Sequence, residues 1–395
     1  MNDAAQSARR DESLYRWRDD LDSSDYIQVI YEVAVTCAGE QAAMAIAMAQ
    51  SPGDDPVEDT TVASARAANQ VRVVQVIELS DQRVADFVKG QVTTADEMSA
   101  TAALMCFWIE LAVPLRLIAG KPAQLFSVLL GTLPGVACLQ RYRLVSANLP
   151  ANFGPGAGFA IDGLRRLSQR PVGPFSCRTV RRSAVSDASA LVQFSCDVLV
   201  NGMDIVKDHE LTVFATFAEF KQHVRGMISA RDAARVETGA QKLYFANLIC
   251  EPWELSQRWD LCCYLGVDGV VVAPWLQGWG TLSYLARLKK MPILAENTLG
   301  ERFTRQLDGI IDRSVLQHWL QTLGADFYFA GEHWDGCNAV VDLPVAPLQA
   351  PKDVHGLVSP AVKIVPVLHG EIAADNLAKC RALIGSDDFV LISDR

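Results

Sequence analysis

Four side chains of the kinds that bind metals or transfer protons stand in a row at residues 207–210, with the sequence Lys-Asp-His-Glu. They follow a short apolar stretch. Asn247, the pair Glu296-Asn297 and the segment His369-Gly370-Glu371 follow three further apolar stretches. Carboxylate and imidazole groups are the usual general acids, general bases and ligands of enzyme sites. If the apolar stretches are strands of one sheet, these polar groups can meet at one edge of it.

The apolar stretches belong to a regular pattern in the second part of the chain. Short apolar runs lie at 174–178, 203–206, 242–246, 269–273, 292–295, 326–329, 364–368 and 389–392, and helices are predicted at 186–200, 217–238, 252–264, 282–289, 315–323 and 373–383. Strands that alternate with helices at this spacing are typical of a parallel α/β barrel. The Pro-rich segment 331–362 is predicted to be irregular. In such barrels the chemistry lies at the carboxyl ends of the strands, where the polar groups above occur.

The first part of the chain has a different pattern. Strands are predicted at 26–33, 71–79 and 141–145 and a helix at 40–49, which indicates an α+β unit. The Pro/Gly/Asn-rich segment 146–158 predicts a domain boundary near residue 150. We therefore expect an N-terminal α+β domain at 1–150 and a C-terminal barrel at 151–395. The polar first 25 residues are expected to form a loosely docked arm.

Composition excludes several classes of protein. The net charge is −10, so a basic nucleic-acid-binding surface is not expected. The most apolar segment, 101–120, contains Glu110, Pro114 and Arg116, which argues against a membrane span. The polar start lacks the apolar core of a signal peptide, and the ten cysteines include no CxxC pair. We therefore predict a cytoplasmic protein with reduced thiols, without nucleic-acid or membrane partners.

Several segments together resemble one known family. Residues 202–210, with the sequence GMDIVKDHE, resemble the G-x-D-F-x-K-D-D-E segment after the second barrel strand of RuBisCO large subunits and RuBisCO-like proteins. Weaker matches occur in the family's order at 111–115, 130–135, 153–173 and 247–255. The sequence thus resembles a RuBisCO-like protein of form IV that is divergent at the active site. The resemblance implies a ferredoxin-like N-terminal domain, a TIM-type barrel and a homodimer, and the barrel is expected to be truncated after strand 8.

The resemblance also implies a metal site. Lys207 matches the lysine that takes up CO2 as a carbamate in RuBisCO, and Glu210 matches a metal-binding acid. His209 stands where the family has a metal-binding Asp. One divalent metal ion is therefore expected on Lys207, His209 and Glu210. It would be Mg2+ as in the family, or a transition metal if His209 is a ligand, because imidazole suits transition metals. The alternative is that no metal binds and that Lys207 forms an ion pair with Glu210.

The chain departs from the family wherever the family binds phosphate. Val180 replaces a catalytic lysine, although Arg182 keeps a cation nearby. Glu296 and Asn297 stand in the place of a His and a phosphate-binding Arg, and a carboxylate repels phosphate. The family's final Gly-rich phosphate loop has no counterpart in this sequence. We therefore do not expect carboxylation of ribulose bisphosphate or binding of a bisphosphate.

Two hypotheses about function remain open. The first is an enolate-type isomerase, decarboxylase or related lyase that acts on a small polar carbonyl compound. Its catalytic residues would be Lys207, Glu296, His369 and Asn247, and its substrate-binding residues Arg182, Asn297, Gly370, Glu371 and Trp275. The second is a non-catalytic scaffold or regulatory subunit that pairs with another protein. The first is preferred, because the replacements at the strand ends are themselves polar, ligand-type groups.

Overall fold

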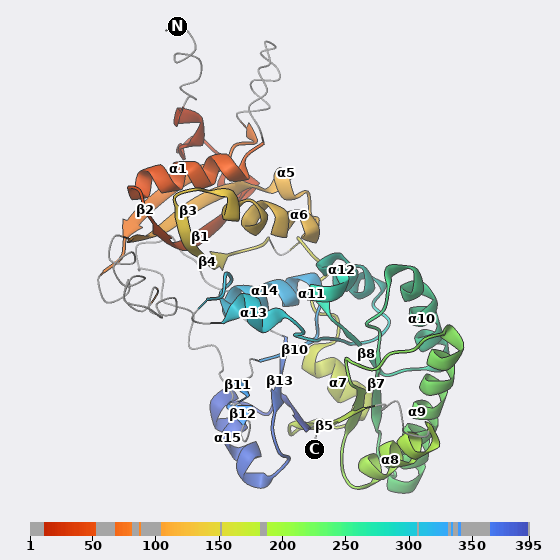
Figure 1. Ribbon diagram of the computed structural model, residues 1–395. Coiled ribbons are helices and arrows are strands. Elements are labelled where there is room, and N and C mark those ends of the chain that lie inside the picture. Colours follow the sequence, from red (N-terminus) through yellow and green to blue (C-terminus); the bar gives the residue numbers. More distant parts are fainter. Residues whose placement is uncertain are drawn as a thin grey trace, which may run out of the picture. The chain divides into compact units, whose positions relative to one another are not determined.

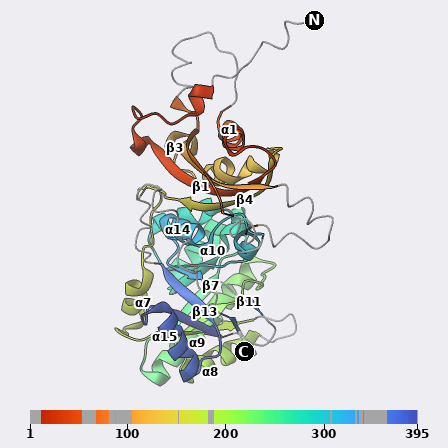
Figure 2. The same cartoon turned by 90° about the vertical axis from the view of Figure 1, so that its left-hand side faces the viewer.

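The computed structural model describes residues 12–52, 68–80, 87, 104–150, 152–181, 188–305, 308–330, 333–334, 339–340 and 364–393. The chain divides into two compact units (Figures 1 and 2). The first contains Met1–Pro150 and Arg302–Leu316, and the second contains Ala151–Glu301, Gln317–Val354 and Val358–Arg395. Because they are separate bodies, each unit is described by itself below.

The first unit is built on a four-stranded antiparallel sheet. Its strands are β1 (Tyr26–Val35), β2 (Arg72–Glu78), β3 (Met105–Pro114) and β4 (Leu139–Ala147), and its helices include α1 (Gly39–Gln50), α5 (Leu115–Ile118) and α6 (Pro122–Phe126). The strand order is β2-β3-β1-β4, with every neighbouring pair antiparallel. This is the order of the ferredoxin-like fold, so the predicted α+β architecture is confirmed.

The segment that precedes β1 packs more firmly than its polar sequence suggested. Two short 3-10 turns, Glu12–Tyr15 and Ser23–Asp25, lie in it, and Tyr15 is buried. The backbone N–H of Trp17 donates to the carbonyl of Val73 in β2, and the Arg72 guanidinium donates to the carbonyl of Leu14. The prediction of a loosely docked arm is therefore wrong for residues 12–25, because backbone hydrogen bonds and one buried tyrosine fix them to the sheet.

The second unit is a closed parallel barrel of eight strands. These are β5 (Phe175–Val180), β6 (Ile205–Asp208), β7 (Leu243–Asn247), β8 (Gly269–Val272), β9 (Ile293–Ala295), β10 (Phe327–Phe329), β13 (Val365–His369) and β14 (Val390–Ser393). They follow one another round the barrel in chain order, and β14 pairs with β5 to close it. Each strand coincides within two residues with one of the eight predicted runs. The predicted TIM-type barrel is confirmed.

Six helices coincide within three residues with the six predicted ones: α8 (Ala188–Val200), α9 (Phe217–Thr238), α10 (Pro252–Leu265), α12 (Trp279–Leu288), α14 (Arg313–Leu323) and α15 (Ala374–Ile384). Three further helices, α7 (Ala160–Ser168), α11 (Pro274–Gln277) and α13 (Gly300–Thr304), were not predicted. Between β10 and β13 the described residues form a two-stranded hairpin, β11 (His333–Trp334) with β12 (Ala339–Val340). The rest of the Pro-rich segment lies outside the described residues.

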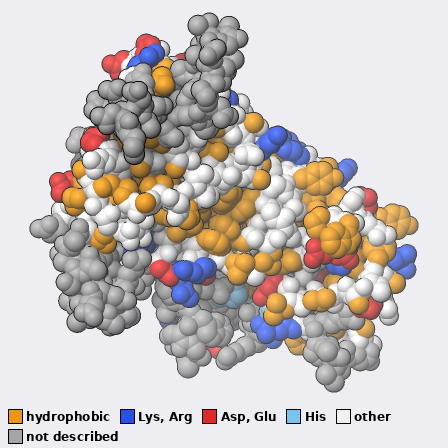
Figure 3. All heavy atoms as spheres, turned by 45° about the horizontal axis from the view of Figure 1, so that its top comes forward, with side chains coloured by type: hydrophobic (Ala, Val, Ile, Leu, Met, Phe, Trp, Pro, Cys, Tyr) orange, Lys and Arg blue, Asp and Glu red, His pale blue; other side chains and the backbone are white. Residues whose placement is uncertain are grey.

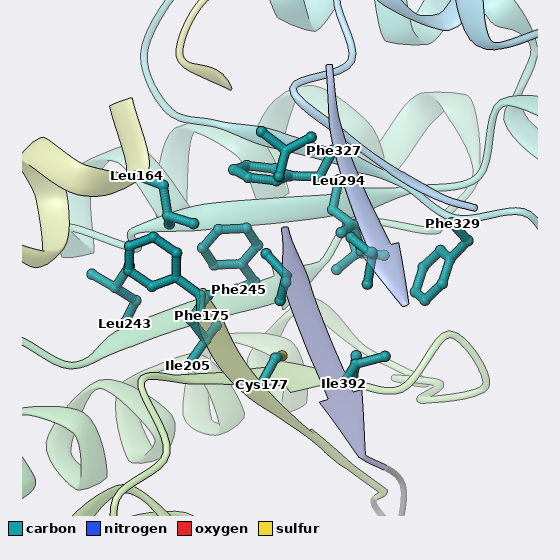
Figure 4. Close-up of a cluster of buried hydrophobic side chains, with 14 residues drawn as sticks. Leu164, Phe175, Cys177, Ile205, Leu243, Phe245, Leu294, Phe327, Phe329 and Ile392 are labelled. Atoms are coloured by element: carbon teal, nitrogen blue, oxygen red, sulfur yellow. The ribbon is translucent and has the colours of Figure 1, made fainter. Parts of the chain in front are cut away.

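The barrel interior is filled by alternate residues of the strands (Figure 4). Phe175 and Cys177 of β5, Ile205 of β6 and Phe245 of β7 all belong to one buried cluster. Successive side chains of a strand point to opposite faces, so the next interior position lies two residues further on. That rule places Lys207 at the carboxyl-terminal edge of the cluster. The core therefore fixes which polar side chains point into the barrel end.

The surface mixes charged and apolar side chains. On the face in Figure 3, acidic and basic groups are interspersed with hydrophobic side chains. Val236, Trp253 and Tyr264 are among the large apolar residues of the barrel unit that are exposed. Among the described residues, no helix has both the length and the hydropathy needed to cross a bilayer.

Candidate functional site

The candidate site lies at the carboxyl ends of the barrel strands. The two-residue alternation of the core leads from Cys177 to Thr179, from Ile205 to Lys207 and from Leu294 to Glu296. In the same way Val367 leads to His369. The same step leads from Phe245 to Asn247, so the side chains expected to face the interior at this end include all four predicted catalytic groups and one threonine.

Lys207 and Glu296 form the central contact of the site. The Nζ atom of Lys207 lies 3.0 Å from Oε2 of Glu296, a charge-assisted hydrogen bond that joins β6 to the residue after β9. Only 3% of the Lys207 side chain and 11% of the Glu296 side chain are exposed. A second carboxylate, Oε2 of Glu210, lies 4.0 Å from the same nitrogen. One lysine is thus enclosed by two acids in a place that is nearly inaccessible to water.

This arrangement determines the charge of Lys207. Burial acts to lower the pKa of the lysine, because the interior solvates an ammonium ion poorly. The negative charges of Glu296 and Glu210 and the hydrogen bond that Lys207 donates to Glu296 oppose the effect of burial and outweigh it, so the pKa of Lys207 is raised. The side chain is therefore an ammonium ion at neutral pH. It can donate a hydrogen bond to an oxygen that gains negative charge.

Phe329 connects this ion pair to His369. Its ring centroid lies 5.4 Å from Nζ of Lys207 and 5.0 Å from the centroid of the His369 ring. An ammonium ion near an aromatic face is stabilised by the charge distribution of the ring. The two predicted catalytic groups therefore contact the same aromatic side chain, from β6 and from the end of β13.

Thr179 supplies a polar atom that the sequence analysis did not single out. Thr179 pairs in register with Lys207 and is 5% exposed. Its Oγ1 has no hydrogen-bond partner among the described residues. An unpaired buried hydroxyl costs free energy, which a bound ligand or water would recover. The alternation with Cys177 was the signal that could have revealed it.

The three predicted metal ligands do not fit a divalent ion in this arrangement. Lys207 is paired as a cation, and a cation repels a metal ion. The Nδ1 atom of His209 accepts a hydrogen bond of 3.0 Å from the backbone N–H of Leu211 and lies 3.3 Å from Oε2 of Glu210, so that nitrogen is already engaged by groups of its own loop. Within the described part of the chain, no three His, Cys, Asp or Glu side chains converge as a metal-binding group. Of the two alternatives, the geometry favours the ion pair, with Glu296 as its nearer partner.

Asn247 fixes the loop that carries His209 and Glu210. Its side-chain N–H groups lie 3.2–3.3 Å from the carbonyl oxygens of His209, Glu210 and Thr212, and its Oδ1 accepts from the backbone N–H of Ile249. Both ends of the amide are thus committed to backbone groups. These contacts make Asn247 a positioning residue for the loop. The predicted contact between Asn247 and a substrate stays untested.

Behind this loop lies a buried polar network centred on Asp208. Its Oδ1 lies 2.8 Å from Nε2 of His223 on α9, and its Oδ2 accepts from the hydroxyl of Tyr244 and the backbone N–H of Asn247. Burial acts to raise the pKa of Asp208, but His223 and the hydrogen bonds outweigh it, so the pKa is lowered. No pattern in the sequence assigns Asp208 a role of its own or links it to a histidine fifteen positions later.

The predicted substrate-binding residues are only partly brought to the ion pair. The backbone N–H of Asn297 lies 3.3 Å from Oε1 of Glu296, and its side chain donates to Glu301. Trp275 stacks edge-on against Trp279, at a centroid distance of 5.1 Å. Gly370 donates its N–H to Ile392, and Glu371 is exposed. Arg182 lies outside the described residues. Asn297 thus makes a backbone hydrogen bond to the central pair.

Comparison with known proteins was made for sequence and for structure. No family model matches the chain. The ribulose bisphosphate carboxylase of Archaeoglobus fulgidus is 26% identical over 214 residues, which are 51% of this chain and 47% of that protein. A 3-oxo-isoapionate-4-phosphate decarboxylase of Rhizobium etli is 23% identical over 222 residues, which are 55% of this chain and 53% of the relative. The chain thus spans about half the length of the curated relatives it matches.

Solved structures match over nearly the whole chain. The dimeric archaeal Rubisco of Hyperthermus butylicus aligns with a TM-score of 0.77 at 18% identity, covering 97% of this chain and 88% of the other. A rubisco-like protein (MtnW) of Alicyclobacillus acidocaldarius aligns with a TM-score of 0.75 at 20% identity, covering 93% and 87%. Identities this low establish the fold alone. Together with the sequence matches, they confirm the resemblance: this chain resembles RuBisCO and the RuBisCO-like proteins of form IV in sequence and in fold.

Proposed function

We propose that this protein is a RuBisCO-like enzyme that forms an enolate from a small polar carbonyl compound and is not a ribulose-bisphosphate carboxylase. The observation that carries the proposal is the buried pair of Lys207 and Glu296 at the carboxyl end of the barrel, 3.0 Å apart. Enolate formation needs a base for a C–H proton and a positive group for the oxygen that becomes negative. The pair supplies both.

The distances suit this chemistry. The proton that is removed lies on the carbon next to the carbonyl, so the base and the oxygen-binding group must be neighbours. In the proposed reaction Nζ of Lys207 donates a hydrogen bond to the substrate oxygen, and the carboxylate of Glu296 removes the proton. His369, against the same Phe329 ring, returns a proton to another carbon or to a leaving group. Isomerisation passes through such an enolate. A decarboxylation would form the enolate by breaking the C–C bond to CO2 instead of a C–H bond, and would use Lys207 for the enolate oxygen and His369 for the proton that then goes to carbon.

Two relatives support a function of this type. One is named a 3-oxo-isoapionate-4-phosphate decarboxylase, and one structural neighbour is a rubisco-like protein rather than a carboxylase. For this chain we propose a substrate without two phosphates, because Glu296 and Asn297 occupy the place of the family's His and phosphate-binding Arg. Ribulose bisphosphate should therefore neither turn over nor raise the melting temperature.

The test is solvent exchange of carbon-bound protons. Small keto acids, ketoses and hydroxyketones are incubated with the protein in D2O, and NMR follows the loss of the proton signal next to the carbonyl. The wild type should exchange at least one compound, and Lys207→Met and Glu296→Gln should each slow that exchange by 100-fold or more, as expected when a general base or a charge-stabilising donor is lost. Lys242→Met is the matched control, because Lys242 is also buried but donates to the carbonyl of Met203 at the other end of the barrel.

Two outcomes would count against this function. If no compound exchanges its carbon-bound protons, the result favours the hypothesis of a non-catalytic scaffold. If exchange persists in folded Lys207→Met protein, the site lies elsewhere.

We also propose that the protein assembles as a homodimer, because one structural neighbour is described as dimeric. Light scattering should then give a solution mass of twice that of the 43.1 kDa chain.

A further inference from the structure

In this chain the surroundings of Lys207, which matches the lysine that the family modifies, suit an ammonium ion. The Nζ atom of Lys207 has a carboxylate oxygen at 3.0 Å, a second at 4.0 Å and a phenylalanine ring on a third side. The side chain is 3% exposed. Every group that contacts the nitrogen is thus one that a positive charge prefers.

A carbamate would reverse this preference. Carbamate formation joins the lysine nitrogen to the carbon of CO2, releases a proton, and converts a group of charge +1 into one of charge −1. In this site the new anion would lie beside Glu296 and Glu210. Three negative charges in a buried place repel one another strongly unless a cation joins them. A metal ion is the cation that the family uses for that purpose.

The neighbouring loop offers few free ligand atoms for such a metal ion. The Nδ1 of His209 is taken by the N–H of Leu211, and Asn247 holds the carbonyl oxygens of His209 and Glu210. The loop is thus fixed, and the His209 ring is engaged in a hydrogen bond within it. A metal ion bound to a carbamate at Lys207 would therefore lack the Asp ligand that the family has at the position of His209.

We propose that the Lys207–Glu296 ion pair takes the place of the family's carbamate and metal ion. Lys207 remains an unmodified side chain, and Glu296 is the residue that keeps it so. The site is therefore complete without CO2 and without a divalent ion. This inference does not depend on which reaction the protein catalyses, since it concerns the chemical state of one lysine.

The test is direct detection of the carbamate. The full-length protein is equilibrated with 13C-bicarbonate and Mg2+ at pH 8, and 13C NMR is used to count carbamate carbons per chain. Calorimetry measures Mg2+ and Mn2+ binding to the same samples. The wild type should show no carbamate at Lys207 and no stoichiometric metal. Either one in the wild type overturns the proposal, and this measurement needs no variant.

Three variants then test the role of Glu296. Glu296→Gln removes the nearer charge but keeps the shape, and the double variant His209→Asp/Glu296→Gln also restores the family's ligand type. Carbamate should appear in the double variant, and its affinity for Mn2+ should exceed that of the wild type by at least tenfold. Glu210→Gln is the matched control and should show no carbamate, since the 3.0 Å pair remains. If the folded double variant stays free of carbamate, Glu296 is not the residue that prevents it.

Discussion

Asp208 shows how much a single buried side chain can hold in place. Its carboxylate binds His223 from α9, Tyr244 from β7 and the backbone N–H of Asn247, and it is fully buried. Asn247 in turn holds the loop that carries Glu210. A charge buried this deeply is stable only because each of its oxygens is paired. The geometry of the candidate site therefore depends on a residue that does not itself face the barrel interior.

The lowered pKa of Asp208 gives a pH-dependent prediction. A carboxyl whose pKa is lower in the folded than in the unfolded chain stabilises the fold above its unfolded pKa, about 4, and loses that contribution as the pH falls through its folded pKa. Asp208→Asn should lower the free energy of unfolding at pH 7 by about 3–5 kcal/mol, because it leaves His223 without its charged partner. Urea unfolding between pH 3 and pH 7 measures the difference.

The difference between wild type and Asp208→Asn should shrink below about pH 4, as the wild-type carboxyl becomes protonated. The exposed Asp197, on α8, provides the control substitution Asp197→Asn, which should change stability by less than about 0.5 kcal/mol. A wild-type advantage that is constant down to pH 3 would contradict the assigned ionisation.

The side-chain N–H donors of Asn247 can be tested by substitution. Asn247→Asp replaces two N–H donors by a carboxylate oxygen that faces the carbonyl oxygens of His209, Glu210 and Thr212. Unpaired acceptors and like charges make this substitution unfavourable by about 2–4 kcal/mol. Differential scanning calorimetry should show a lower melting temperature than for Asn201→Asp, an exposed control. Equal melting temperatures would mean that the loop is held by other contacts.

At the scale of elements, helix α9 illustrates why the sequence predicted so much of the barrel. Its bounds, Phe217–Thr238, equal the predicted range. Thr216 caps the start, because its Oγ1 accepts from the N–H of Glu219, and Gly239 ends the helix with a positive φ of 67°. Such signals are local in sequence. The contact of His223 with Asp208 joins a helix to the end of a strand, and no local pattern in the sequence predicts it.

The same distinction applies to the candidate site. The polar side chains at the strand ends were predictable, since each follows a recognisable apolar run. The pairing of Lys207 with Glu296 was not, because 89 positions separate the two residues and the sequence suggested Glu210 as the partner. The metal site was predicted from the resemblance alone, and the hydrogen bond that occupies His209 Nδ1 could not be foreseen from residue types.

The packing of α8 on α9 supplies a prediction about elements. A Cβ atom added at Gly226 of α9 would lie 2.7 Å from Cγ2 of Val192 on α8. Alanine is the better helix former, but valine is rigid in a helix, so the two helices would have to separate. Gly226→Ala should destabilise the protein by about 1–3 kcal/mol.

A double-mutant cycle checks this packing. Val192→Ala removes the methyl group that the new Cβ would meet, so the double variant should be more stable than the sum of the two single effects predicts by about 0.5–3 kcal/mol. Chemical denaturation of the four proteins gives the coupling. Additive effects would show that the helices tolerate the extra methyl group without movement.

At the scale of the whole barrel, the last strand is the one that closes the ring. Strand β14 pairs with β13 on one side and with β5, the first barrel strand, on the other. Val390 and Ile392 belong to the common core and pair in register with Phe175 and Cys177 of β5. Without β14, the hydrogen-bonding edges of β5 and β13 would be exposed, and open parallel edges of this kind favour aggregation.

A deletion of residues 386–395 should therefore abolish cooperative unfolding, although it removes only a short segment. Closure is a property of the complete ring, since each strand is held by two neighbours and the core by all eight. Circular dichroism should show a broad thermal transition, and gel filtration should show aggregates. Deletion of Asp394 and Arg395 alone is the control, because the described pairing of β14 with β5 and β13 is made by Val390–Ser393. A sharp, wild-type transition in the longer deletion would mean that seven strands and their helices suffice for the fold, and that the last strand serves only to place residues at the site.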